Sequence, residues 1–161
     1  MAYGVITTPV TGTTISTTAF GIKVKDNFDA AFPLGVDGWT SFTPTLTQSV
    51  TVTKTVTYAK YQRVGRTIFA SYDLAITGAG TTANAILLGL PVAAATTGCA
   101  TGSFRYFDTG NTIYAGSVVS NTTTTLQFFV SGNGNPMGVN PTFAAANGDS
   151  MQVHVTYEAA T

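Results

Sequence analysis

The segment from Thr51 to Tyr58 alternates strictly between two kinds of side chain. Every odd-numbered position from 51 to 57 is threonine, and the even-numbered positions carry Val52, Lys54, Val56 and Tyr58. Successive residues of a β-strand point to opposite sides, so a period of two places each kind of side chain on its own face. The repeat restricts this stretch to extended structure and predicts one sheet face covered with threonine.

A tight turn follows and leads into another strand. Arg63-Val64-Gly65-Arg66 predicts a hairpin turn, because glycine adopts the positive φ that two-residue hairpin turns need. The strand expected over 66–77 carries apolar side chains on one face: Ile68, Ala70, Tyr72, Leu74 and Ile76. We expect Arg63 and Arg66 to face solvent or to pair with acidic residues of a neighbouring subunit.

Short strands separated by turn residues account for the chain beyond residue 38. The expected strands are 42–47, 50–58, 59–64, 66–77, 85–91, 99–108, 112–120, 124–131 and 150–158. The last strand alternates cleanly and places four apolar residues on one face: Met151, Val153, Val155 and Tyr157. No helical periodicity separates these strands, so the pattern predicts a mainly β fold, an antiparallel β-sandwich of jelly-roll type.

The first 38 residues have a different character. Residues 1–12 lack periodicity and predict an extended arm, whereas 13–32 predict one short amphipathic helix with an apolar stripe at intervals of four. This stripe can pack beneath the chain's own sheet or against copies of itself, and both alternatives stay open. We therefore divide the chain into an anchoring and oligomerisation segment, 1–38, and a β-sandwich domain, 39–161. The candidate oligomer or anchor contacts are the apolar residues Tyr3, Val5, Ile6, Phe20, Val24, Phe28 and Phe32.

The chain carries few charges and many threonines. Charged residues make up 9% of it, with seven basic and seven acidic side chains, and 31 residues are threonine. Soluble domains are about 25% charged. A surface of threonine and glycine loses little side-chain entropy when it is covered, so it suits permanent contact with other subunits. The only basic cluster is Lys60, Arg63 and Arg66, which does not predict a nucleic-acid partner.

Neither a membrane nor a secretory route is predicted. The longest apolar candidate, 85–95, is interrupted by Gly89 and Pro91 and is too short to cross a bilayer. The first residues lack the basic region and hydrophobic run of a secretory signal. We expect the protein to be made and assembled in a cytosol.

Residues that carry chemistry are scarce. His154 is the single histidine and Cys99 the single cysteine. We expect the histidine on the face opposite its neighbouring valines and the cysteine as a small buried apolar residue. Asp108 and Asp149 lie in turns and are expected to bond their own backbone. The sequence predicts no catalytic, metal or cofactor site and no enzyme, with distant paired carboxylates of a glycosidase as the weaker alternative.

Aromatic residues and one long loop are the remaining surface candidates. Tyrosines on the predicted sheet are compatible with a carbohydrate-binding face or with a core. Phe128 and Phe129 place one ring on each face of a strand, which fits a sheet buried against another subunit and equally a sheet covered by the helix. The loop over 132–141 is long enough to predict a functional or contact-making role.

Several of these segments together resemble a known group of proteins. The run from Trp39 to Thr47 and the run from Tyr58 to Thr67 resemble a pattern common in virion proteins of tailed bacteriophages. In that pattern, a tryptophan and an aromatic-Thr-Pro-Thr element precede a Tyr-x-Arg-Val-Gly-Arg/Lys turn in a small β-sandwich. Leu88-Gly89-Leu90-Pro91-Val92-Ala93 is similar to a Leu-Pro-Val-Ala segment of the same group, and 12–28 is similar to its helical lead-in.

This resemblance implies a virion structural protein without enzymatic activity. The expectation that we place first is a capsid decoration (cement) protein, a homotrimer on the outside of the head. Its partners would be copies of itself and the major capsid protein or another virion protein. The alternative is a minor tail or tail-fibre module that binds host-surface glycans. An enzyme such as a glycan hydrolase comes third.

Overall fold

The structure is a computed structural model that describes residues 38–110 and 112–160. This part of the chain contains ten β-strands and no helix, and every pairing between the strands is antiparallel. The strands are β1 (Thr40–Ser41), β2 (Leu46–Gln48), β3 (Val50–Thr51), β4 (Lys54–Val64), β5 (Thr67–Ile76), β6 (Leu87–Gly89), β7 (Thr101–Asp108), β8 (Thr112–Ser120), β9 (Thr125–Val130) and β10 (Ser150–Glu158). The predicted mainly β, antiparallel class is confirmed.

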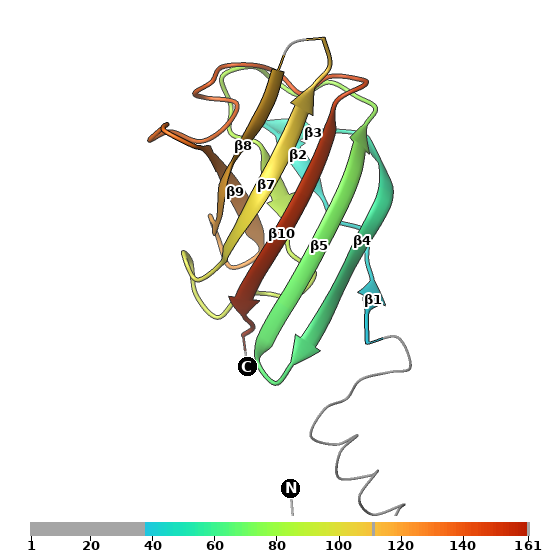
Figure 1. Ribbon diagram of the computed structural model, residues 1–161, viewed down its shortest axis with the longest axis vertical. Helices are drawn as coiled ribbons and strands as arrows, with labels where there is room; N and C mark the ends of the chain where they lie inside the picture. Colours follow the sequence, from blue (N-terminus) through green and yellow to red (C-terminus); the bar gives the residue numbers. More distant parts are fainter. Residues whose placement is uncertain (1–37, 111, 161) are drawn as a thin grey trace, which may run out of the picture.

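All ten strands belong to one hydrogen-bonded sheet in the order β1-β4-β5-β10-β7-β8-β9-β6-β2-β3. The sheet curls, so that β4, β5, β10 and β7 form the front layer in Figure 1, with β9, β2 and β3 behind. β10 lies in the middle of the front layer, paired over 150–158 with β5 and over 150–156 with β7. The predicted sandwich or jelly roll of separate sheets is not confirmed, because hydrogen bonding continues from one layer into the other.

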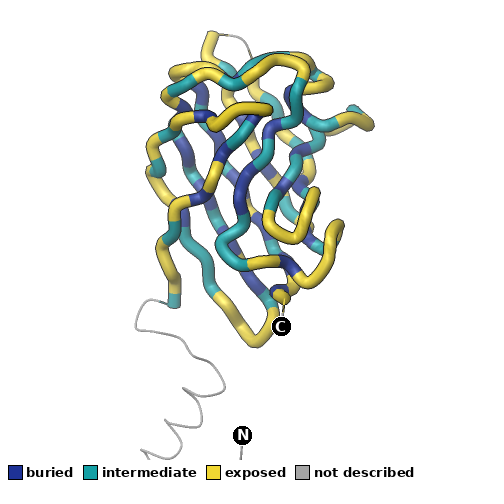
Figure 2. The backbone as a smooth tube through the Cα atoms, turned by 180° about the vertical axis from the view of Figure 1, so that it is seen from behind, coloured by how far each residue is buried: buried dark blue, intermediate teal, exposed yellow. Residues whose placement is uncertain are grey.

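The core lies inside the curl and follows the alternation of the strands. The inward residues of β5 and β10 are all buried: Ile68, Ala70, Tyr72, Leu74, Ile76, Met151, Val153, Val155 and Tyr157. Figure 2 shows buried positions alternating with more exposed ones along these strands. Phe104 of β7 and Phe128 of β9 meet edge to face, with ring centroids 5.2 Å apart. Each large apolar side chain buried here stabilises the fold by about 1.5–3 kcal/mol.

The predicted boundaries fail in the region before β5. The predicted division into strands 50–58 and 59–64 is wrong. Residues 54–64 form one continuous strand, and Val50–Thr51 form a separate short strand. The strand predicted over 42–47 is also mostly wrong, since pairing in β2 begins at Leu46. Pro44 precedes it, and proline has no N–H to donate to a ladder.

A β-bulge in β4 overturns the strict alternation expected there. The register shifts between Val56 and Tyr58, which leaves Thr57 without a partner in β5. An extra residue in one strand reverses which face the following side chains occupy. Tyr58 therefore points away from the core, 38% exposed, instead of sharing a face with Val56, which packs against the core.

The predicted arm and helix lie outside the described residues, which begin at Gly38. The same holds for the candidate oligomer or anchor contacts Tyr3, Val5, Ile6, Phe20, Val24, Phe28 and Phe32.

The predicted hairpin turn joins β4 to β5. Val64 pairs with Thr67, so Gly65 and Arg66 are the two turn residues, and Gly65 has a φ of 60°. A positive φ at the first turn residue alone is the pattern of a type II′ turn. Arg63 Nε donates to the carbonyl oxygen of Gly65 over 2.8 Å.

We predict that Gly65→Val lowers the free energy of unfolding by about 1–3 kcal/mol. A Cβ at this position meets no atom within 4 Å, so the loss comes from the backbone conformation rather than from a clash. Urea denaturation measures it. The control is Arg66→Gln, which removes an ion pair between half-exposed side chains, 3.1 Å from Arg66 Nε to Glu158 Oε1. This change should cost about 0–1 kcal/mol. A Gly65→Val protein as stable as the parent would contradict the turn assignment.

Candidate functional site on the outer face of the sheet

Side chains of β4, β5, β10, β7 and β8 that point away from the core form one broad surface, which we call the outer face. The strand register aligns residues of six strands across it in a single row: Ser41, Lys60, Ser71, His154, Ser103 and Ser117. Strands far apart in the sequence therefore contribute neighbouring polar groups. His154 lies opposite its flanking valines and is exposed, as predicted.

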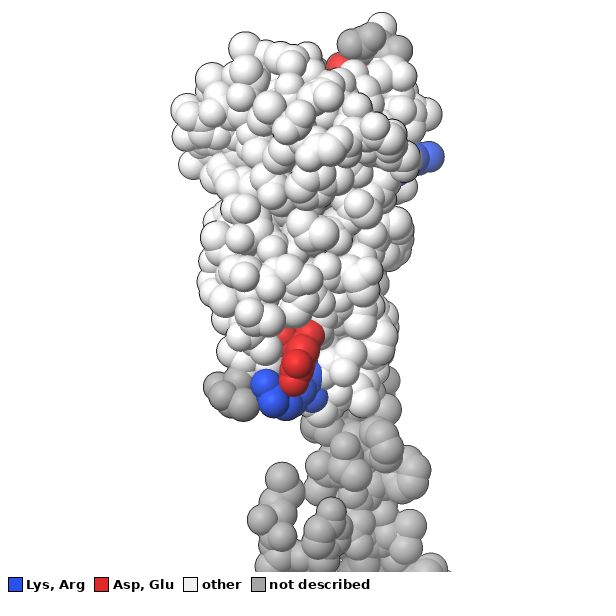
Figure 3. Space-filling view, turned by 90° about the vertical axis from the view of Figure 1, so that its left-hand side faces the viewer, with Lys and Arg blue, Asp and Glu red and all other residues white. Residues whose placement is uncertain are grey.

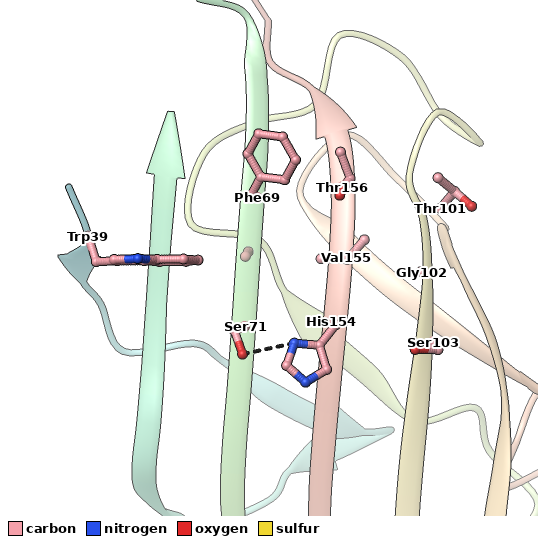
Figure 4. Close-up of a pocket in the computed structure, with 10 residues that line it drawn as sticks. Trp39, Phe69, Ser71, Thr101, Gly102, Ser103, His154, Val155 and Thr156 are labelled. Carbon is pink, nitrogen blue, oxygen red and sulfur yellow. Dashed lines mark hydrogen bonds between the residues drawn. The ribbon is translucent and has the colours of Figure 1, made fainter. Parts of the chain in front are cut away.

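Large apolar side chains are also exposed on this face. Phe69, Phe107 and Ile113 have relative exposures of 41%, 41% and 55%. Phe107 and Ile113 are register partners of β7 and β8, so they form an adjacent apolar pair. Trp39, just before β1, is 40% exposed and extends across β4 (Figure 4). Clusters of exposed apolar side chains mark contact or binding surfaces more often than isolated ones do.

Beside Trp39 the outer face is hollowed into a groove of about 510 Å³. Its lining comes from the chain before β1 and from β5, β7 and β10: Trp39, Phe69, Ala70, Ser71, Thr101, Gly102, Ser103, His154, Val155 and Thr156. Figure 4 shows the Trp39 ring reaching in from one side, with His154 and Thr156 on the central strand. None of the ten residues is aspartate, glutamate, lysine or arginine.

Within the groove, Ser71 and His154 are joined by a hydrogen bond. Ser71 Oγ lies 3.1 Å from Nδ1 of the His154 ring. A serine nucleophile needs a base that is itself oriented by a third group. The nearby carboxylate of Asp73 instead accepts a hydrogen bond from Gln152 Nε2 over 3.1 Å. Among the residues that the structure describes, the pair therefore lacks the third member of a triad, and it offers hydrogen-bonding groups to a bound molecule.

Charge is sparse over the surface. The side of the molecule in Figure 3 shows charged groups in only a few small spots. On the outer face, Lys60 Nζ lies 5.5 Å from the centroid of the Tyr58 ring, a cation–π contact. Among the described residues, no three histidine, cysteine, aspartate or glutamate side chains gather as a metal site would require. This part of the chain also has no helix long and apolar enough to span a membrane.

The other sequence candidates take different places. Arg66 pairs with Glu158 of its own chain. Cys99 is partly buried against the core. The loop over 132–141 is held by Met137, which is fully buried. Asp149 does bond nearby backbone, as expected, but it also accepts a hydrogen bond from the distant Tyr106.

The sequence pattern identified some groove residues and missed others. Alternation alone placed His154 outward. Periodicity does not apply to Trp39, because it lies outside any strand, and only the resemblance to virion proteins draws attention to it. Phe69 occupies an outward position of β5. The alternation of that strand could have predicted its exposure.

Compared with known proteins, the chain matches no protein-family model, no curated protein and no solved structure. Functional assignment therefore depends on the residues and their geometry.

Proposed function

We propose that the protein is a structural subunit of a tailed-bacteriophage virion. Within that class we place first a capsid decoration (cement) protein that acts as a homotrimer on the outside of the head. The observation that supports this assignment is the outer face, where large apolar side chains are exposed: Trp39, Phe69, Phe107 and Ile113. The sequence resemblance of the Trp39 and Tyr58 segments points to the same class.

A surface of this kind favours lasting contact over free circulation. Interface centres are enriched in aromatic residues, and the exposed Phe107 with its register partner Ile113 forms an apolar patch of that kind. Threonine and serine side chains have few rotatable bonds, so ordering them at an interface costs little entropy. No enzymatic activity forms part of the proposal.

Trimerisation would turn weak contacts between each subunit and the capsid shell into firm binding. Three subunits that bind neighbouring sites act at a high effective concentration, so the assembly can bind firmly although each contact is weak. The partners in this proposal are copies of the chain and the major capsid protein or another virion protein. Assembly would take place in the host cytoplasm.

Two measurements test the proposal. Light scattering should give about three times the chain mass of 16.6 kDa, and the protein should remain on purified heads that lack tails.

We expect the double variant Phe107→Ser, Ile113→Ser to lose trimer or head binding, since it removes the apolar pair. Val50→Ser, at a 48% exposed position of β3 in the other layer, is the matched control and should keep both. A monomer that never associates with heads would refute the assignment.

A minor tail or tail-fibre module that binds host-surface glycans is the second candidate. The groove beside Trp39 favours it, because an exposed indole among hydroxyl groups is suited to a sugar. Recovery of the protein with tails and not with heads would select this candidate.

A further inference from the structure

The groove on the outer face combines two features that a sugar ring requires. One is a flat aromatic surface: the Trp39 indole is 40% exposed, with Phe69 beside it at 41%. The carbon-bound hydrogens of a pyranose form an apolar patch that packs on such a ring, in the way that C–H groups meet the negative face of an aromatic system. Exposing both rings to water is unfavourable in the free protein, so a ligand that covers them gains free energy.

The second feature is a set of polar side chains with regular spacing. Ser71 of β5, His154 of β10 and Ser103 of β7 are register partners across three adjacent strands. Neighbouring strands lie about 4.8 Å apart, which is the scale of one sugar ring. Thr156 and Thr101 form the next row. Each of these groups can donate or accept a hydrogen bond, as the hydroxyls of a sugar can.

The charge of the groove restricts the ligand further. Its lining contains no lysine or arginine to bind a phosphate, sulfate or carboxylate, and no aspartate or glutamate to bind a cation. An ionic group placed here would lose water without meeting an opposite charge among the lining residues, and Lys60 of the adjoining strand lies over the Tyr58 ring instead. A neutral ligand with many hydroxyl groups avoids that loss.

From these observations we propose that the groove binds a neutral hexopyranoside, with the Trp39 ring as the stacking surface and with His154 and Ser103 as hydrogen-bonding groups. Such a site extends the proposed structural role and is compatible with a subunit of either the head or the tail. Because Nδ1 of His154 is engaged by Ser71, Nε2 is the ring nitrogen that remains for a sugar hydroxyl.

The chain contains one tryptophan, so its fluorescence reports on the groove directly. We would titrate the protein with methyl glycosides of glucose, galactose, mannose and N-acetylglucosamine, and with the methyl glycoside of glucuronic acid as a charged comparison. At least one neutral glycoside should change the emission with a Kd of about 1 mM, the weak affinity expected for an open site. The glucuronide should bind at least about tenfold more weakly than the best neutral glycoside.

Variants then locate the site by calorimetry. Trp39→Ala should abolish measurable binding, and Ser103→Ala should weaken it about five- to tenfold, the effect of one lost hydrogen bond. Val50→Ser, at an exposed position of β3 outside the groove, should leave the affinity unchanged. Thermal unfolding checks that each variant is folded, and Ser103→Ala keeps the test decisive if Trp39→Ala is not.

Three results would overturn the proposal: no binding of any neutral glycoside, equal binding of the glucuronide, or binding that survives both Trp39→Ala and Ser103→Ala. A Trp39 emission that shifts with protein concentration alone would show that a second copy covers the groove, and would also overturn it. The glycoside titrations are separate from the head-binding and light-scattering tests, so failure of one proposal can be told from failure of the other.

Discussion

Replacing Asp149 with alanine is expected to lower the free energy of unfolding by about 3–5 kcal/mol, one of the two largest effects that we predict for a single side chain. Its carboxylate is almost fully buried and accepts three hydrogen bonds: from Tyr106 Oη over 2.7 Å, from the Thr109 N–H over 2.9 Å and from the Ala146 N–H over 2.8 Å. Alanine would leave all three donors without this acceptor.

The Tyr106 phenol donates one of these three hydrogen bonds, and its protonation state is set by the same surroundings. Burial, followed by the hydrogen bond to Asp149, raises the pKa of Tyr106 well above its usual value. The phenol therefore keeps its proton and acts as a donor at all ordinary pH values. Urea denaturation monitored by circular dichroism measures the loss of stability in Asp149→Ala. Asp73→Ala is the control, because the Asp73 carboxylate is only partly buried and should contribute about 1 kcal/mol or less. Equal losses from the two variants would contradict this role of Asp149.

Gln48→Leu is expected to cost about 2–5 kcal/mol, although leucine is similar in size and more apolar. The side chain is fully buried, and its amide connects β2 to two loops. Nε2 donates to the carbonyl oxygens of Asn84 and Phe143, over 3.0 and 2.8 Å, and Oε1 accepts from the Ala145 N–H over 2.8 Å. Leucine would bury three backbone groups without partners, and each costs about 1–3 kcal/mol.

The same substitution at Gln62, a partly exposed position of β4, is the matched control and should change stability by less than about 0.5 kcal/mol. Both variants can be compared by urea denaturation. If Gln48→Leu were as stable as Gln62→Leu, the amide would not hold these loops.

Close backbone approach makes the Gln48 contacts possible. A Cβ at Gly138 would lie 2.3 Å from the carbonyl oxygen of Asn84 and 2.8 Å from Gln48 Nε2. Gly138 also has a φ of 97°, which other residues rarely adopt. Glycine is therefore needed here for both space and backbone conformation.

Strands with a clean alternation could be predicted closely from the sequence. The ends of β8 and β10 agree with the predicted 112–120 and 150–158, and the inward residues of β5 are those expected. Alternation records which face a side chain occupies, and a buried face leaves a strong signal. It does not record which strands are neighbours, so one curled sheet and two packed sheets look alike in the sequence.

Features that depend on distant contacts could not be predicted. The bulge at Thr57 leaves the composition of β4 unchanged, so nothing in the threonine repeat marks it. Asp149 resembled an ordinary turn residue because Tyr106 and Thr109 lie 43 and 40 positions away. The groove could not be predicted for the same reason, because the strand register assembles it from separate parts of the sequence. Only the outward position of His154 could be predicted.

The position of β10 has a consequence for synthesis of the protein. A ribosome makes this strand after the other nine, yet β10 occupies the middle of the sheet between β5 and β7. Until residues 150–158 leave the exit tunnel, β5 and β7 each lack the neighbour that completes their ladder, and the inward side chains have no closed core to enter. The sheet therefore cannot close before β10 has been made, and polypeptides released before that point present unpaired strand edges to chaperones and proteases. Only molecules that contain β10 can close the sheet, so incomplete translation products cannot become competent to assemble.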